Sequence, residues 1–156
     1  MSTALSFRNR QGARTLNSLL LREIVRHLLH EEFALQEYEL CFHLVGEKEM
    51  AKVNWQFLQH EGSTDVITFD LAEPGSSGLA GEIYISVPDA VKQAREFGTT
   101  WQEELIRYII HSLLHLRGYD DLEASKRRAM KREENRLVKK VASQFSLRNL
   151  ASRRPS

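Results

Sequence analysis

The stretch WQEELIRYIIHSLLHLRGYDD, residues 101–121, decides how this chain folds and where its chemistry lies. Its apolar residues recur at steps of three and four over a broad surface, which predicts a central and largely buried helix over residues 101–116. Thr100 and Glu103 have the spacing of a capping box, which marks the start of this helix. Gly118 marks its end, because glycine readily takes the positive φ that turns the chain back.

Two histidines and an acid in this stretch form a candidate metal site. His111 and His115 are four residues apart, so their Cβ atoms share one helix face at about 5–6 Å and can approach one ion. Asp121 follows the turn at Gly118 and is expected to return as a third ligand. This donor set suits one divalent ion, Zn²⁺, with a fourth position open to water as in catalytic sites. The alternative is a pair of core histidines followed by turn residues.

The spacing H-x-x-x-H-x-x-G-x-x-D resembles that of the metzincin zinc proteases. Those enzymes carry a glutamate directly after the first histidine as the general base, and Ser112 stands at that position here. Peptidase activity is therefore disfavoured. The sequence singles out no other residue as a general base, so no catalytic residue is assigned.

Outside this stretch, helical and strand patterns mix without the regular alternation of a doubly wound fold. The class expected is α+β, with a small mixed sheet packed with about five helices and the metal site at the end of the central helix. We expect one domain over residues 1–146 and a basic, disordered tail over residues 147–156. The periodicity predicts helices over residues 16–29, 47–60, 90–97, 101–116 and 122–145, and strands over residues 38–44, 65–71 and 81–86. The last two strands are expected to pair through the turn-rich loop between them.

Composition is that of one globular domain, with 156 residues of which 42% are hydrophobic and 28% charged. Cys41 is the single cysteine, which excludes an intramolecular disulfide and a thiolate-rich zinc site. Residues 1–10 lack the apolar run of a signal peptide, and no stretch approaches the length of a membrane span. We therefore expect a cytoplasmic protein without a membrane partner.

Charge is unevenly distributed along the chain. Residues 1–120 carry 11 Lys and Arg against 17 Asp and Glu, whereas residues 121–156 carry 11 against 4, so balances of −6 and +7 give the net +1. This asymmetry favours an anionic partner near the C-terminal segment, and a solvated helix face is the alternative. The basic residues closest to the candidate metal site are Lys126, Arg127, Arg128, Lys131 and Arg132.

Several blocks of the chain resemble the YbeY family, bacterial metal-dependent endoribonucleases implicated in ribosomal RNA maturation. Residues 111–121 resemble the family signature H-G-x-L-H-L-x-G-Y-D-H. Asn54 and residues 63–69 resemble the family's L-N-x-x-Y-R and P-T-D-V-L-S-F blocks, and residues 81–86 resemble its G-[DE]-I-x-I-S strand. The blocks occur in the family's order and cover most of residues 40–121.

Three positions depart from the family pattern. Ser112 replaces a glycine, and Asp121 replaces the family's third histidine ligand with a carboxylate that can also bind zinc. Leu58 aligns with the family's arginine, which removes a cation that could hold phosphate.

The resemblance implies a single-strand-specific endoribonuclease acting in ribosomal RNA maturation and ribosome quality control, with ribosomal RNA and the small ribosomal subunit as partners. No DNA substrate is expected. The basic residues after Asp121 would hold the RNA backbone beside the metal. Thr64 and Asp65 could line the same cleft, although a turn or cap is the more usual role for such a pair. Two alternatives remain: an RNA- or ribosome-binding homologue that retains the metal without cleaving, and a metallohydrolase with another substrate.

Overall fold

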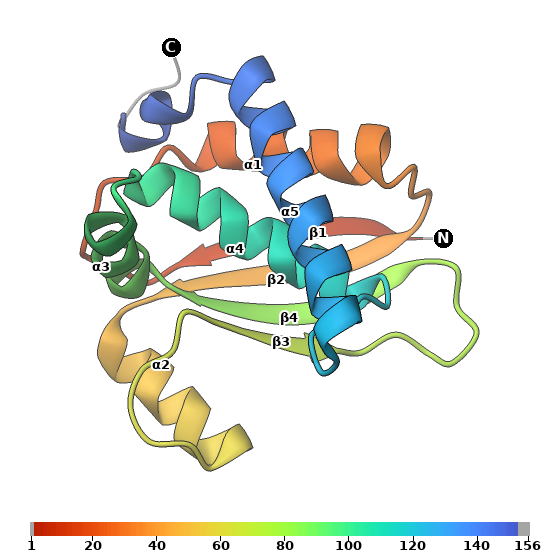
Figure 1. Ribbon diagram of the computed structural model, residues 1–156, viewed down its shortest axis with the longest axis horizontal. Coiled ribbons are helices and arrows are strands. Elements are labelled where there is room, and N and C mark those ends of the chain that lie inside the picture. The colour runs from red at the N-terminus through yellow and green to blue at the C-terminus, as the bar shows by residue number, and fades with distance from the viewer. Residues whose placement is uncertain (1, 153–156) are drawn as a thin grey trace.

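A four-stranded mixed sheet forms the centre of the computed structural model, which describes residues 2–152 (Figure 1). The strand order is β1-β2-β4-β3, with β1, β2 and β4 parallel and β3 antiparallel to β4. The strands are β1 (Thr3–Asn9), β2 (Tyr38–Val45), β3 (Val66–Asp70) and β4 (Leu79–Ser86). The antiparallel pairing of β3 with β4 confirms the hairpin expected from the sequence.

Five α-helices surround this sheet in the described part of the chain. α1, α4 and α5 lie over one face, α2 lies under the other face, and α3 lies beside one end (Figure 1). Their bounds are α1 (Ser18–His27), α2 (Glu47–Val53), α3 (Val87–Phe97), α4 (Trp101–Leu116) and α5 (Ala124–Gln144). π-Helical turns over Leu28–Glu32 and Asn54–Leu58 extend α1 and α2. None of the helices over residues 2–152 has the length and apolar run needed to cross a bilayer.

The expected α+β class is confirmed, and β1 is the strand that the sequence pattern did not predict. β1 is an edge strand of the sheet, and among its seven residues only Leu5 is buried. Such a strand shows no clear alternation of apolar residues, because one of its faces is largely exposed. Parallel pairing with β2, whose residues are mostly buried, holds it in place.

α4 packs along the sheet and carries most of the core. Its residues Ile109 and Leu113 are fully buried with Phe42 of β2 and Ile83 of β4. Gly81 of β4 permits this packing, because a Cβ there would lie 3.1 Å from Leu116 Cδ1 and 3.0 Å from a main-chain oxygen. The glycine in the family-like strand block therefore has a packing role. A smaller core lies under the opposite face, between α2 and the sheet.

The ends of α4 follow the sequence closely. Thr100 Oγ1 accepts a hydrogen bond from the Glu103 main-chain N–H at 3.2 Å, as in a capping box. Within residues 2–152, the reciprocal bond from the Glu103 side chain is not formed, and Thr99 Oγ1 donates to Glu104 instead, at 2.9 Å. At the other end Gly118 has φ +102°, the left-handed conformation expected of the residue that ends this helix.

The tail predicted for residues 147–156 is wrong in its first part. Leu147–Ala151 form a 3₁₀-helical turn, and Leu150 is completely buried in the main core. The Asn17 main-chain N–H donates to the Leu150 carbonyl at 2.8 Å, which ties the turn to the start of α1. Leu147 and the preceding Phe145 also pack against this core. Residues 153–156 of the predicted tail lie outside the described residues.

Candidate active site

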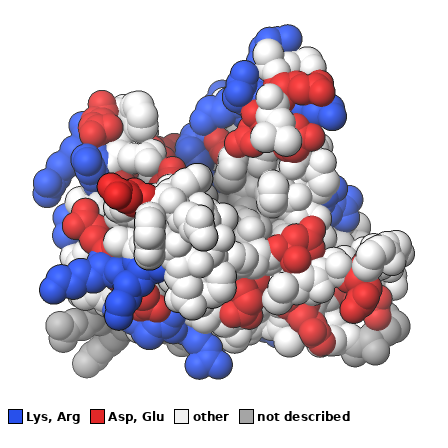
Figure 2. All heavy atoms as spheres, turned by 90° about the horizontal axis from the view of Figure 1, so that it is seen from below, with Lys and Arg blue, Asp and Glu red and all other residues white. Residues whose placement is uncertain are grey.

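A pocket of about 620 Å³ opens between α4, the first half of α5 and the start of β3. Cationic and anionic side chains both line it, together with a few apolar ones. In chain order, the lining residues are Asp65, Val66, Gln93, Arg107, Tyr108, His111, Asp121, Arg127, Arg128, Met130, Lys131 and Glu134. Seen from below, the molecule presents largely uncharged surface at its centre, with acidic and basic side chains around it (Figure 2). A pocket of this size can admit one or two nucleotide units or a small anionic molecule.

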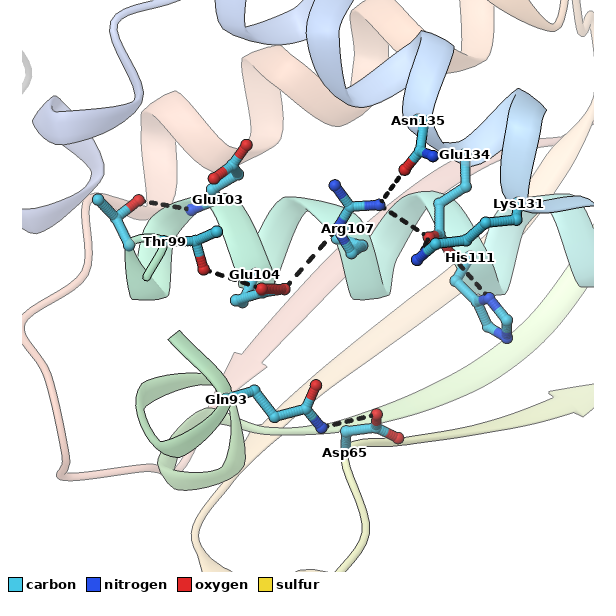
Figure 3. Close-up of polar contacts among 11 residues, drawn as sticks. Asp65, Gln93, Thr99, Glu103, Glu104, Arg107, His111, Lys131, Glu134 and Asn135 are labelled. Atoms are coloured by element: carbon cyan, nitrogen blue, oxygen red, sulfur yellow. Dashed lines mark hydrogen bonds and ion pairs between the residues drawn. The ribbon is translucent and has the colours of Figure 1, made fainter. Parts of the chain in front are cut away.

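His111 is held in a fixed orientation on the pocket wall. Its Nδ1 lies 2.9 Å from Glu134 Oε1. An ionised carboxylate can only accept, so Nδ1–H donates to it and Nε2 is left for another partner. Figure 3 shows the imidazole reaching from α4 into the open space beyond Glu134. This arrangement matches the carboxylate–histidine pairs that orient metal ligands in proteins.

Glu134 is a buried carboxylate that joins α5 to α4. Its Oε2 accepts hydrogen bonds from Arg107 at 2.9 Å and from Lys131 at 3.0 Å. Burial would raise the pKa of Glu134, but the hydrogen bonds from His111, Lys131 and Arg107 outweigh it and lower that pKa to about 2. The same contact raises the pKa of His111 against the opposing effect of its burial. Glu134 is therefore ionised at neutral pH and stabilises a proton on the imidazole.

The structure brings two of the three predicted metal ligands to one pocket. Asp121 lines it with His111, and its negative charge contributes to the raised pKa of that histidine. His115 is exposed on the last turn of α4 and is not among the lining residues. Among the residues that the structure describes, the donor atoms of His111, His115 and Asp121 do not all lie within 4.8 Å of one another.

Three of the five predicted RNA-binding cations reach the pocket. Arg127, Arg128 and Lys131 line it from α5. Lys126 instead lies 3.6 Å from Asp120 in an ion pair, and Arg132 lines a separate hollow on another side of α5. Lys131 lies four residues after Arg127 and three after Arg128, so these three side chains share one side of α5.

Several lining residues were not assigned from the sequence. Arg107 lies four residues before His111, so helical spacing could have placed it on the same face. Glu134 is 23 residues from His111, and only the packing of α5 on α4 brings them together. Ser112 and Leu58, two positions at which the sequence departs from the family pattern, do not line the pocket. Ser112 is buried with its hydroxyl donating to the Ile109 carbonyl at 2.7 Å, and Leu58 is exposed outside the pocket.

A second group of donors lies on the face of the sheet that α2 partly covers. In the described part of the chain, Cys41, His43 and Glu82 are the three donors of this kind whose ligand atoms lie within 4.8 Å of one another. His43 Nε2 is 2.7 Å from Glu82 Oε1, and its Nδ1 is 3.1 Å from an Arg10 nitrogen. Arg10 can only donate, so neutral His43 accepts at Nδ1 and donates at Nε2. Both ring nitrogens are thus in use, and the group is a hydrogen-bonded network.

The fold and this pocket define a class of protein: an α+β domain with an oriented histidine, acidic side chains and several cations in one pocket. Residues 6–142 match the family model described as Endoribonuclease YbeY, and the chain belongs to that family. It is 40% identical over 123 residues to the Endoribonuclease YbeY of Chlorobaculum tepidum, covering 78% of this chain and 87% of the relative. With the Salinibacter ruber relative of the same description, identity is 31% over 144 residues, covering 88% and 91%.

A solved structure supports the same fold. The solution structure of a protein from Thermotoga maritima superposes with a TM-score of 0.65 at 30% sequence identity, covering 90% of each chain.

Proposed function

We propose that this chain is a metal-dependent endoribonuclease that hydrolyses single-stranded RNA in the pocket between α4 and α5. The observation that carries this proposal is the orientation of His111. Glu134 holds its Nδ1, and its Nε2 has no partner among residues 2–152, in a pocket that also holds Asp121 and four cations, Arg107, Arg127, Arg128 and Lys131. Its membership of a family described as endoribonucleases favours RNA as the anionic substrate.

We propose His111, His115 and Asp121 as the ligands of one divalent ion. His111 and Asp121 line the pocket, and His115, on the last turn of α4, would have to turn toward them. Two imidazoles and a carboxylate favour zinc, and the His111–Glu134 pair has the arrangement found behind metal ligands. A bound ion of this kind polarises a phosphate oxygen and makes water a better nucleophile at neutral pH. The chain itself supplies the orientation of His111 and the charge around the pocket.

Arg127, Arg128 and Lys131 would bind RNA phosphates next to the metal. All three line the pocket, and of these Lys131 is also bonded to Glu134. Arg107 has a different role, because its guanidinium donates to Glu134 and to Asn135 at 2.7 Å. We therefore assign Arg107 to the support of Glu134. A flexible single strand can enter such a concave site, whereas paired bases would be held out of it.

For the natural substrate we propose ribosomal RNA during its maturation in the cytoplasm, with the small ribosomal subunit as the partner. The resemblance of residues 111–121 and 81–86 to the family blocks supports this. An RNA-binding homologue without cleavage is the second candidate, because Leu58 at the position of the family's arginine leaves no cation there.

Cleavage of a labelled single-stranded RNA, with and without chelator, tests the proposal. We expect cleavage that stops with EDTA and that is lost in His111→Ala and in His115→Ala. RNA that is bound and left intact in the presence of added Zn²⁺, Mn²⁺ or Mg²⁺ would instead establish the binding homologue.

Metal content tests the ligand set separately. One divalent ion per chain is expected in the purified protein, with loss in His111→Ala and in Asp121→Ala. Retention of the ion in Asp121→Ala would remove that residue from the set.

A further inference from the structure

We infer that the wall of the pocket formed by Asp65 and Gln93 binds an RNA base and selects bases that carry an exocyclic amino group over uracil. This inference rests on the proposed function and adds a base subsite to it. The cations of the pocket belong to α4 and α5, whereas Asp65 precedes β3 and Gln93 belongs to α3. Figure 3 shows these two residues across an open space from Arg107 and His111. The side of the pocket formed by α4 and α5 therefore suits phosphate, whereas the side formed by Asp65 and Gln93 carries no cation.

The carboxylate of Asp65 is held in place by two hydrogen bonds. Its Oδ1 accepts from the Val66 main-chain N–H at 2.8 Å, and its Oδ2 accepts from Gln93 Nε2 at 3.1 Å. Each carboxylate oxygen has capacity for a further donor. Within residues 2–152 the Gln93 carbonyl oxygen has no hydrogen-bond donor of its own. This wall therefore offers several acceptors in fixed positions and few donors.

Apolar side chains of the pocket suit the flat body of a base. Val66 and Met130 line the pocket, and Met130 is buried. The ring of Tyr108 lines it as well, and burial raises the pKa of this phenol, which keeps it protonated. Its hydroxyl has no hydrogen-bond partner among the described residues. The site thus combines apolar surface with a few fixed polar groups, as small-ligand sites usually do.

The acceptors of Asp65 and Gln93 discriminate among bases by their edges. Cytosine presents an amino group at C4 and adenine one at C6, and aspartate and glutamine side chains pair with such groups in known complexes. Uracil presents a carbonyl oxygen at C4, where cytosine presents the amino group, so at that position it would place an acceptor against the acceptors of Asp65 and Gln93. A good pair of this kind changes discrimination by on the order of ten-fold or more.

A single-stranded oligouridine of about twelve nucleotides with one central cytidine tests the inference. We expect cleavage next to the cytidine on the order of ten-fold more often than at uridine–uridine steps. In Asp65→Asn the new amide can donate to uracil O4, so the cuts should spread along the strand. Asp70→Asn is the matched control, because it removes the same charge from an exposed position in β3 outside the pocket. Its cleavage pattern should be that of the unmodified chain.

Gln93→Met provides a second variant should Asp65→Asn fail to fold, as judged by circular dichroism. It keeps the length of the side chain, removes both polar ends, and should weaken the preference for cytidine. Equal cleavage at all steps by the unmodified chain, or a preference that persists in the variant that folds, would overturn the base subsite while leaving the nuclease intact. Absence of cleavage of every RNA would overturn the proposed function and this inference with it.

Discussion

Glu134 is the residue on which the orientation of His111 depends. Its Oε1 accepts from His111 Nδ1 at 2.9 Å, so Glu134→Gln replaces a charged acceptor with a neutral one of similar shape. Carboxylates in this position typically contribute about 10–100-fold to metal affinity, and we expect a loss in that range. Competition with a chromophoric zinc chelator measures it. Glu133→Gln, beside it on α5 and paired with Arg136, should leave the affinity unchanged. An unchanged affinity in Glu134→Gln would show that the orientation of His111 by Glu134 does not contribute to metal binding.

The ion pair of Glu134 also predicts how the metal-free protein responds to acid. Its pKa is lowered in the folded chain, so the pair stabilises the fold above pH 4.5 and loses this effect as the pH falls toward about 2. The lowering from 4.5 to about 2 corresponds to roughly 3 kcal/mol, at about 1.4 kcal/mol for each pH unit. About 2 kcal/mol of this should be lost by pH 3. For His111 the sign is opposite, because a raised pKa stabilises below pH 6.5 and the effect is lost as the pH rises through the folded value.

Urea unfolding in chelator at pH 7 and pH 3 measures the acid effect. The free energy of unfolding should fall more steeply in the unmodified chain than in Glu134→Gln. Equal falls in the two proteins would mean that Glu134 is not ionised as the structure indicates.

At the residue scale, local spacing predicted some of the site and missed the rest. His111, Arg127, Arg128 and Lys131 reach one pocket because α4 and the turn at Gly118 follow directly from helix periodicity and glycine conformation. Glu134, Gln93 and Tyr108 come from segments far apart in the chain or from the buried face of a helix. Nothing in their local sequence distinguishes them from solvated or core residues, so only tertiary packing identifies them.

Among the elements, the 3₁₀-helical turn over Leu147–Ala151 shows how little sequence signal an anchored segment needs. Leu150 belongs to this turn and is fully buried. Leu150→Ala should therefore destabilise the protein by about 2–5 kcal/mol, because apolar burial is lost and a cavity is left. Leu19→Ala is the control, because that side chain is largely exposed on α1, and its effect should be within about 0.5 kcal/mol. Chemical denaturation measures both. Equal stability of the two variants would mean that the turn is not part of the folded domain.

Elements with strong periodicity were predicted well, and those without it were not. α4 occurs at the predicted residues because sixteen residues carry a continuous apolar surface between two clear boundary signals. β1 was not predicted, since an edge strand with one buried residue carries almost no pattern. The second helix continues through a π-helical turn to Leu58, which the periodicity could not distinguish from an ordinary helix.

On the scale of the whole molecule, the basic C-terminal part of the chain supplies three of the four cations that line the pocket. The net charge is only +1, yet three cations of α5 line one cavity near His111. RNA bound there should release counterions, so its affinity should fall with monovalent salt at a slope of about −0.7 for each phosphate neutralised. Charge of this kind gives affinity for any sequence and carries no base preference.

Arg128→Ala tests whether the pocket cations contribute to RNA affinity in this way. With chelator present to prevent cleavage, we expect weaker binding to every single-stranded RNA and a slope reduced by about 0.7, because one phosphate contact is lost. Lys139→Ala removes the same charge from a hollow on another side of α5 and should leave the slope unchanged. Fluorescence anisotropy over a range of NaCl concentrations measures both. Equal slopes in the two variants would place the RNA backbone elsewhere, whereas a slope lowered only in Arg128→Ala would locate the strand at the mouth of the pocket that holds His111 and Asp121.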